Sequence, residues 1–282
     1  MNAWMLAGAA LALAASPATA QTRERTDAPH LDPYKIILVG DSTMAPHSGW
    51  ASAFCMHHVK SSVACLNAGR GGRSTRSYRQ EGSWAIALAE ARVPGYRATY
   101  VLIQFGHNDQ SSKSERWTEQ TTEFPANLRR FVEEVRAAGA IPVLLTPLTR
   151  REFKQGKLQN TLASWSDQVR KVAAEMQVPL VDLNARSAAL VQKMGARDAT
   201  QLAQVPPSAE ELAAAEAGST LPPKPAPEVH PAPPADPKAP RGTITRKFDY
   251  THLGDVGAEV IARLVARDLA AVAPDLRSQL LP

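Results

Sequence analysis

The sequence has 282 residues, 44% of them hydrophobic, which allows one large domain or two small ones with a substantial core. Its formal net charge at pH 7 is +5 and its pI is near 9.3, so acidic partners such as nucleic acid, anionic lipid or acidic polysaccharide are favoured. Neither the interleaved aromatic and basic residues of RNA-binding proteins nor zinc-finger spacing is present, so we expect no nucleic-acid partner.

The first 20 residues predict a signal peptide. Residues 4–15 form an apolar run, and Ala18-Thr19-Ala20 supplies the small residues typical of a cleavage site, although the segment before the run lacks Lys and Arg. The mature protein would then begin at Gln21, with residues 21–33 as a polar lead-in. Neither this run nor any other stretch is long enough for a comfortable membrane span. We therefore expect an exported protein, periplasmic or extracellular, without a membrane anchor after cleavage.

The chain has two cysteines, Cys55 in a predicted helix and Cys65 in the strand that follows it. Export would permit a disulfide between them, but the geometry of a helix and a strand could allow or forbid the bond, so both outcomes stay open. Two cysteines do not make a metal site, and we expect no metal.

Short apolar runs alternate with stretches of helical periodicity along most of the chain. Strands are predicted at residues 34–39, 62–66, 100–105, 141–146 and 178–182. Helices are predicted at residues 49–59, from about 74, and at 83–91, 122–138, 164–176, 185–194 and 255–271. Thr122 could cap its helix, and Gly139 ends it. This alternation predicts a three-layer α/β/α sandwich around a five-stranded parallel sheet with the flavodoxin-like strand order 2-1-3-4-5.

The composition changes between residues 196 and 248. Eleven of the 22 prolines lie between Pro206 and Pro240. A short helix is predicted at 208–217, with Ser208 as its cap and Glu211 three residues later. The rest is rich in Pro and Ala, which is typical of an extended, flexible segment, and a compact domain rarely needs such a loop. We therefore assign the domain to residues 34–195 and 249–282, interrupted by an insertion at 196–248.

A candidate nucleophile follows the first predicted strand. Ser42 lies in Gly40-Asp41-Ser42-Thr43, just past the carboxyl end of a central strand and at the expected entry to a helix, where open α/β sheets carry their chemistry. A hydroxyl nucleophile needs a base and a group that orients the base. His252 can serve as the base and Asp249, three residues earlier in the same loop, can hold its imidazole.

The developing oxyanion needs fixed hydrogen-bond donors. The candidates are the backbone N–H groups of Ser42 and Gly72 and the side-chain amide of Asn108, although the neighbouring Gly71 could replace Gly72. These residues follow strands one, two and three, which are neighbours in the predicted sheet, so three distant loops would line one crevice. The nucleophile motif Gly-x-Ser-x-Gly of ordinary α/β-hydrolases is absent.

These residues resemble the signature of the SGNH (GDSL-like) hydrolases, and the wider motifs resemble the rhamnogalacturonan acetylesterases within them. The motifs are Gly40-Asp41-Ser42-Thr43, Asn67 with Gly72-Arg73-Ser74-Thr75-Arg76-Ser77-Tyr78, Gln104-Phe105-Gly106-His107-Asn108-Asp109, Thr146-Pro147 with Arg150-Arg151, and Asp249-x-Thr251-His252. The resemblance implies removal of acetyl groups from pectic polysaccharide without metal or cofactor. The sequence departs from the family pattern at Ala51, where glycine is expected, and in its larger Pro-rich insertion.

Four arginines follow the second strand at intervals of three: Arg70, Arg73, Arg76 and Arg79. Arginine binds carboxylates bidentately, so Arg73 or Arg76 could clamp the galacturonate carboxylates of a substrate. The alternative is that these side chains form ion pairs that hold the Gly-rich loop.

Other polar and aromatic residues near the motifs have weaker assignments. His107 and Asp109 flank Asn108 and are expected to support the site rather than to react. Trp117, in the polar loop after strand three, belongs to the core or rim, with sugar stacking as the alternative. Arg150 and Arg151 serve either the fold or the wall of the cleft.

The sequence therefore predicts an exported serine esterase that acts through an acetyl-enzyme on an acetylated, acidic plant polysaccharide, with rhamnogalacturonan as the first candidate. Alternatives are an acetylxylan esterase, a broader esterase or lipase acting on small or lipid esters and, least favoured, an inactive carbohydrate-binding protein. The acetyl position and the oligomeric state are not predicted.

Overall fold

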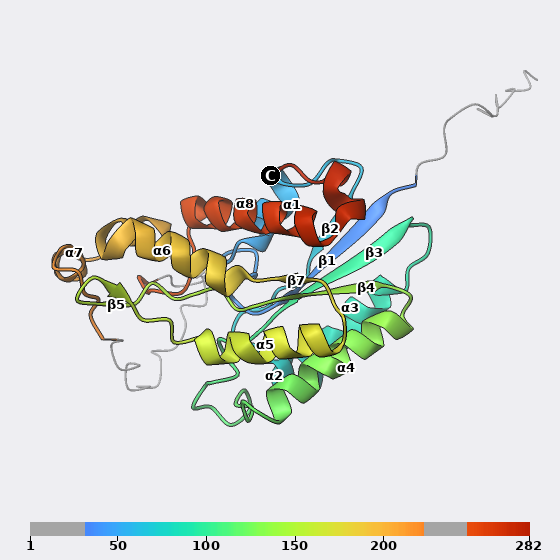
Figure 1. The fold of residues 1–282 in the computed structure, drawn as a ribbon, viewed down its shortest axis with the longest axis horizontal. Coiled ribbons are helices and arrows are strands. Elements are labelled where there is room, and N and C mark those ends of the chain that lie inside the picture. Colours follow the sequence, from blue (N-terminus) through green and yellow to red (C-terminus); the bar gives the residue numbers. More distant parts are fainter. Residues whose placement is uncertain (1–31, 223–246) are drawn as a thin grey trace, which may run out of the picture. The chain divides into compact units, whose positions relative to one another are not determined.

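The computed structural model describes residues 32–222 and 247–282, so the predicted signal peptide lies outside the described residues. Five parallel strands form one sheet in the order β2-β1-β3-β4-β7 (Figure 1). They are β1 (Tyr34–Gly40), β2 (Ala64–Asn67), β3 (Ala98–Gln104), β4 (Ile141–Leu145) and β7 (Leu180–Val181). This order confirms the predicted flavodoxin-like sheet.

The central strand β1 is buried along its whole length, between β2 and β3. Its side chains alternate between the two faces of the sheet, as the period of a strand requires. Ile36 and Leu38 join one hydrophobic cluster, and Ile37 and Val39 join the other. The continuous apolar run of the sequence thus reflects a strand covered by helices on both faces.

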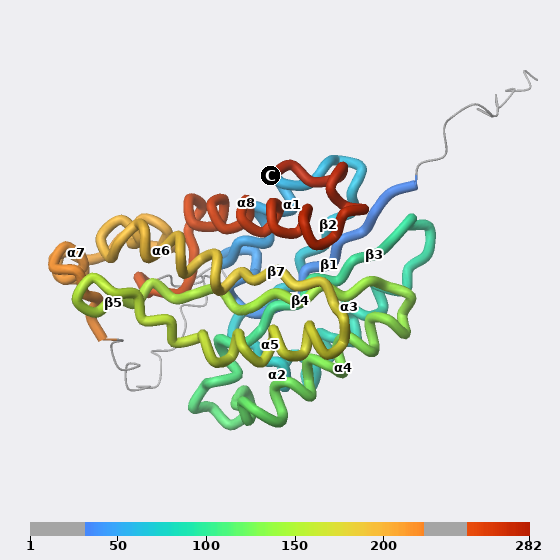
Figure 2. Tube along the Cα trace, viewed as in Figure 1, coloured from blue at the N-terminus to red at the C-terminus, as the bar shows by residue number. Residues whose placement is uncertain are grey.

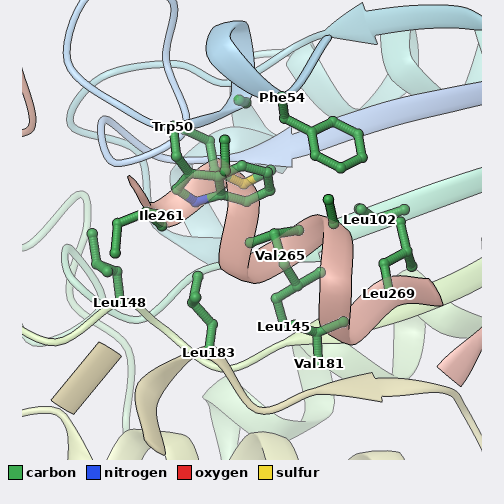
Figure 3. Packing of buried hydrophobic residues seen from close by; sticks show 14 of the residues in the cluster. Trp50, Phe54, Leu102, Leu145, Leu148, Val181, Leu183, Ile261, Val265 and Leu269 are labelled. Carbon is green, nitrogen blue, oxygen red and sulfur yellow. The ribbon is translucent and has the colours of Figure 1, made fainter. Parts of the chain in front are cut away.

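One face of the sheet is covered by α1 (Ala51–His57), α6 (Leu183–Ala199) and α8 (Asp255–Val272). Figure 3 shows this cluster, in which α1 contributes Phe54, and α8 contributes Ile261 and Val265. Trp50, just before α1, is fully buried beside them. The last helix, which follows the predicted base, is therefore fixed to the core along its apolar side.

The opposite face is covered by α2 (Thr75–Gln80), α3 (Ser83–Ala91), α4 (Glu123–Ala137) and α5 (Ala163–Glu175). The trace in Figure 2 places these helices on the side of the sheet away from α8. Ser74 caps α2 through a reciprocal capping box with Ser77, as expected for a helix that begins there. Two helical layers around the sheet confirm the predicted three-layer sandwich.

The start of α4 differs in detail from the prediction. Thr122 occupies the N-cap position, but its side chain does not cap the helix. Instead the carboxylate of Glu119 accepts hydrogen bonds from the backbone N–H groups of Thr121 and Thr122. The predicted end is confirmed, because Gly139 follows the helix in the left-handed region, with φ of 75°.

Residues 196–222 differ from the predicted extended segment. The backbone leaves helical geometry at Gly195, yet α6 resumes and runs to Ala199, followed by a 3-10 turn at Thr200–Leu202. The capped helix α7 (Ala209–Glu216) is present as predicted. Small apolar side chains, Ala196, Ala199, Leu202 and Ala215, are buried against the domain, and this burial explains why the stretch packs. The remainder of the predicted insertion, 223–246, lies outside the described residues.

Two further features join distant parts of the fold. A two-stranded hairpin, β5 (Phe153–Lys154) and β6 (Lys157–Leu158), was not predicted, because strands of two residues leave no periodic pattern. Cys55 and Cys65 form a disulfide with their Cα atoms 5.5 Å apart, which ties α1 to β2. No helix in the described part of the chain is long and apolar enough to span a bilayer.

Candidate active site

Ser42 lies in a tight turn directly after the central strand. The carboxylate of Asp41 accepts hydrogen bonds from the N–H and the hydroxyl of Thr43, both at 2.8 Å, and the Asp41 carbonyl accepts from Met44 N at 3.1 Å. Ser48 donates to the Ser42 carbonyl at 2.7 Å. These contacts fill the stretch between Ser42 and α1, which begins at Ala51, close to the predicted helix start at residue 49.

The structure brings Ser42 together with the predicted base and its orienting carboxylate, 207 and more residues away in the sequence. Ser42 Oγ lies 2.8 Å from Nε2 of His252, and Nδ1 of His252 lies 2.7 Å from Oδ2 of Asp249. An ionised carboxylate only accepts hydrogen bonds, so Nδ1 donates to Asp249 and Nε2 is left to accept the serine proton. This is the tautomer that a general base requires.

Asp249 is held in its ionised form by several donors. Burial acts to raise its pKa, but the hydrogen bond and charge of His252 and the backbone N–H groups of Thr251 and His252 outweigh it and lower the pKa to about 2. Both N–H groups donate to Oδ1 at 2.7 Å. One carboxylate oxygen therefore shapes the turn, and the other orients the imidazole.

Arg151 fixes this turn from the opposite side. Its guanidinium donates to the carbonyls of Asp249, Thr251 and His252 at 3.0, 3.2 and 2.9 Å, and its backbone N–H donates to the carbonyl of Tyr250 at 2.8 Å. Four consecutive carbonyls are thus bound by one residue. Burial lowers the pKa of Arg151 to about 10, so it remains charged at neutral pH. From the sequence alone, Arg151 could serve either the fold or the wall of the cleft. The structure shows that it holds the turn that carries His252.

The three donors that the sequence predicts for an oxyanion beside Ser42 each keep an N–H group that is free in the described residues. Within the described residues, neither the Ser42 N–H nor the Gly72 N–H donates a hydrogen bond. A Cβ on Gly71 would lie 3.7 Å from Cβ of Ser42, so the Gly-rich loop reaches the nucleophile. The Asn108 amide donates one hydrogen bond, to the Arg73 carbonyl at 3.1 Å, and keeps a second N–H. The assignment of these three groups to an oxyanion hole stays a prediction.

A buried polar chain connects the nucleophile turn to the neighbouring strand. Trp50 Nε1 donates to Oε1 of Gln104 at 3.0 Å, Gln104 Nε2 donates to the hydroxyl of Thr43 at 2.5 Å, and that hydroxyl donates to Asp41. Thr43 and Gln104 are both inaccessible to solvent. Thr43, the residue after Ser42, is therefore hydrogen-bonded to Gln104 of β3. Both residues belong to the sequence motifs, but the motifs did not indicate that the two are in contact.

His107 and Asp109 are both buried, and neither forms a hydrogen bond with Ser42, His252 or Asp249 in the described residues. His107 Nδ1 is 3.3 Å from Oδ2 of Asp41. Burial acts to raise the pKa of Asp41, but His107 and Thr43 outweigh it and lower the pKa. Burial raises the pKa of Asp109 to about 7, even though Thr75 and Thr118 donate to it. In the described residues, no three His, Cys, Asp or Glu side chains gather as metal ligands would.

The four arginines after β2 all contact carboxylates. Arg76 pairs with Glu123 through two nitrogens, and Arg79 pairs with Glu134 at 2.7 Å. Arg73 and Arg70 both approach Glu81, at 2.8 and 3.6 Å. The partners lie up to 55 residues away in the sequence, so sequence spacing could not reveal them.

This arrangement favours the ion-pairing alternative for Arg73 and Arg76 over a carboxylate clamp. Trp117 is 47% exposed, so it lies at the surface and is not part of the core.

Comparison with known proteins places this geometry in a family. The profile of the GDSL-like Lipase/Acylhydrolase family matches residues 38–233. The rhamnogalacturonan acetylesterase RhgT of Bacillus subtilis (strain 168) is 34% identical over 178 residues, which cover 60% of this chain and 73% of the relative. The probable rhamnogalacturonan acetylesterase YesY of the same organism is 31% identical over 167 residues, covering 57% of this chain and 75% of the relative.

Solved structures share the fold. Protein YxiM from Bacillus subtilis superimposes with a TM-score of 0.60 at 21% identity, over 85% of this chain and 56% of that one, so the present chain spans little more than half of it. The acetylxylan esterase Axe2 from Geobacillus stearothermophilus, in a catalytic mutant, gives a TM-score of 0.51 at 15% identity, over 83% and 93% of the two chains. The sheet, its helices and the family profile define an SGNH-type carboxylic ester hydrolase. This chain belongs to the GDSL-like Lipase/Acylhydrolase family.

Proposed function

We propose that this protein removes acetyl groups from acetylated rhamnogalacturonan, with Ser42 as the nucleophile. The observation that carries the proposal is the unbroken hydrogen-bonded chain from Ser42 through His252 to Asp249. Two relatives above 30% identity bear the name rhamnogalacturonan acetylesterase, one of them as probable, and this supports the substrate class. The net charge of +5 suits an acidic polymer.

In the proposed reaction, Ser42 Oγ attacks the acetyl carbonyl carbon while its proton passes to Nε2 of His252. The N–H groups of Ser42 and Gly72 and the amide of Asn108 donate to the oxyanion of the tetrahedral intermediate. Asp249 stabilises the imidazolium through Nδ1. Collapse of the intermediate breaks the bond to the sugar oxygen, which takes the proton from His252.

The acetyl-enzyme is then hydrolysed by the same groups in reverse order. A water molecule gives one proton to His252 as its oxygen attacks the acetyl carbon. The second tetrahedral intermediate collapses, acetate leaves, and Ser42 recovers its proton from His252. The cycle consumes one water per ester and needs no other reactant.

Acetate release by the mature protein tests this function. Acetylated rhamnogalacturonan is compared with acetylated xylan and a medium-chain nitrophenyl ester, with Ser42→Ala as the control. Preference for the pectic polymer, abolished in the variant, is the expected result. Turnover of xylan or the longer ester instead would retain the mechanism and reject the substrate, and activity surviving in Ser42→Ala would reject the nucleophile.

We also propose that the protein is exported. The apolar run at 4–15 and Ala18-Thr19-Ala20 support a cleaved signal peptide. The disulfide between Cys55 and Cys65 supports an oxidising compartment. Expression with the native leader, followed by mass analysis of the protein outside the cytoplasm, should give an N-terminus at Gln21; intact protein retained in the cytoplasm would contradict export.

A further inference from the structure

Arg116 lies against the glycine that is predicted to bind the oxyanion. Gly72 has φ of 77°, in the left-handed region, and a Cβ added to it would lie 3.2 Å from Cζ and from both terminal nitrogens of Arg116. Three equal distances mean that the guanidinium presents its flat face to the glycine, since an edge-on approach would bring the nitrogens closer than Cζ. The N–H groups lie in the plane of the guanidinium, so they are directed sideways from the glycine and not at it, where they can meet a ligand.

The charge of Arg116 is weakly compensated. Among the described residues its only ion pair is with Glu115, with Nε 3.8 Å from Oε1, and the Glu115 side chain is 61% exposed. An exposed pair at this distance contributes little and is easily replaced by a stronger anion. By contrast, Arg73, Arg76 and Arg79 each contact a carboxylate at 2.8 Å or less.

The position of Arg116 relates it to the substrate. Gly71 lies beside Ser42, and Gly72 carries the next N–H, so an acetyl group under attack would sit next to the residue that Arg116 covers. The rest of the sugar chain must then extend from the site across the surrounding loops. A guanidinium edge matches the two oxygens of a carboxylate, which is the only charged group of an uronic acid.

We propose that Arg116 binds the carboxylate of an uronic acid residue next to the acetyl ester, and so selects acidic over neutral acetylated polysaccharides. This inference rests on the proposed acetylesterase function and assigns to Arg116 the role that sequence spacing suggested for Arg73 or Arg76. The Arg116 guanidinium can lie flat against residue 72 only because that residue is glycine and has no side chain. In this proposal Gly72 therefore has two roles: its N–H donates to the oxyanion, and its missing side chain leaves room for Arg116.

The test compares acetylated rhamnogalacturonan with the same polymer after chemical reduction of its carboxyl groups. For the wild type we expect kcat/KM to be about 10- to 100-fold higher on the acidic polymer, the contribution of a charged hydrogen-bonded pair. Arg116→Gln should lose this preference, because its kcat/KM should fall by that factor more on the acidic polymer than on the reduced polymer or on p-nitrophenyl acetate. Arg116→Lys, which keeps the charge but not the fork, should retain part of the preference.

Arg263→Gln is the matched control, because it removes one positive charge from the exposed side of α8, where Arg263 pairs with Glu259 at 3.0 Å. It should leave the preference for the acidic polymer unchanged. Equal loss by Arg116→Gln on all three substrates, in protein that melts like the wild type, would mean that Arg116 acts on the oxyanion loop and would overturn the proposal. An unchanged preference in Arg116→Gln would also overturn it.

A second measurement separates this inference from the proposed function. Oligogalacturonate without acetyl groups should competitively inhibit hydrolysis of p-nitrophenyl acetate by the wild type, and should inhibit Arg116→Gln at least about 10-fold more weakly. If the wild type released no acetate from rhamnogalacturonan but showed this difference in inhibition, the proposed substrate would fail and the carboxylate site would stand. Equal inhibition of both proteins, or none of either, would overturn the site.

Discussion

Replacement of Arg151 should disturb the orientation of the His252 imidazole while leaving all three residues of the triad in place. Arg151 is 3% exposed and donates three side-chain hydrogen bonds to the carbonyls of the turn at 249–252. Arg151→Met keeps much of the packing volume and removes every side-chain donor. The carboxylate of Asp249 still contacts His252 in that variant, so the triad itself is chemically complete.

The expected magnitude follows from the bonds lost. A buried acceptor left without its partner costs about 1–3 kcal/mol, and three carbonyls lose theirs, so the unfolding free energy should fall by at least about 3 kcal/mol. A displacement of His252 of the order of 1 Å should lower kcat about 100-fold. Arg151→Lys retains the charge but only part of the donor set, so both effects should be smaller.

The assay is denaturant unfolding together with kcat and KM for p-nitrophenyl acetate, measured well below the melting temperature. We expect kcat to fall and KM to remain close to the wild-type value, because Arg151 contacts the turn at 249–252 and not the acyl group of the substrate. Arg150→Met is the matched control, because the Arg150 side chain donates to the hydroxyl of Thr161 and, among the described residues, donates no hydrogen bond to the turn. Both quantities should stay near wild type in that variant. Wild-type kcat and stability in Arg151→Met would refute the role given to this residue.

Three further outcomes follow from the buried groups. Thr43→Val removes the hydroxyl between Asp41 and Gln104 and should cost about 1–3 kcal/mol in denaturant unfolding, with lower kcat; unchanged stability would contradict the polar chain. The pKa of Asp109 is raised to about 7, so its contribution to stability is present below pH 4 and is lost as the pH rises through 7, by at most about 1.4 kcal/mol per pH unit. The melting temperature of the wild type should therefore fall with pH between 4 and 8, and that of Asp109→Asn should fall less. An identical pH dependence in both proteins would refute this. Reduction of the disulfide, which spans 10 residues, should lower stability by about 3 kcal/mol, and equal melting temperatures with and without reductant would contradict this.

The sequence predicted the sheet and the triad because both depend on local patterns. The run at 34–39 is buried on two faces, and such strands read as continuous apolar segments. Ser42 directly follows β1, at the edge where a parallel sheet gathers its loops, and Asp249 and His252 lie just before α8. Two-residue strands and the packing of 196–222 left no comparable pattern, since they depend on contacts with the rest of the domain.

The roles of the arginines could not be predicted for a different reason. Arg76 and its partner Glu123 are 47 residues apart, and Arg151 binds carbonyls about 100 residues later. Backbone acceptors carry no residue identity, so no motif marks them. The side chain of Arg116 becomes relevant only because Gly72 leaves room for it.

The chain is fixed on both sides of residues 223–246, and this affects how far the length of that stretch can change. Leu221 N donates to the hydroxyl of Tyr250 at 3.2 Å, so the chain departs from and returns to neighbouring points. Tyr250 lies within the turn that Arg151 holds. By the loop-closure relation, each doubling of the length of a connection between two fixed points costs only about 0.6 kcal/mol. Changes in the length of the stretch at 223–246 should therefore leave the position of His252 unchanged, because the turn that carries it is held by Arg151 and not by that stretch.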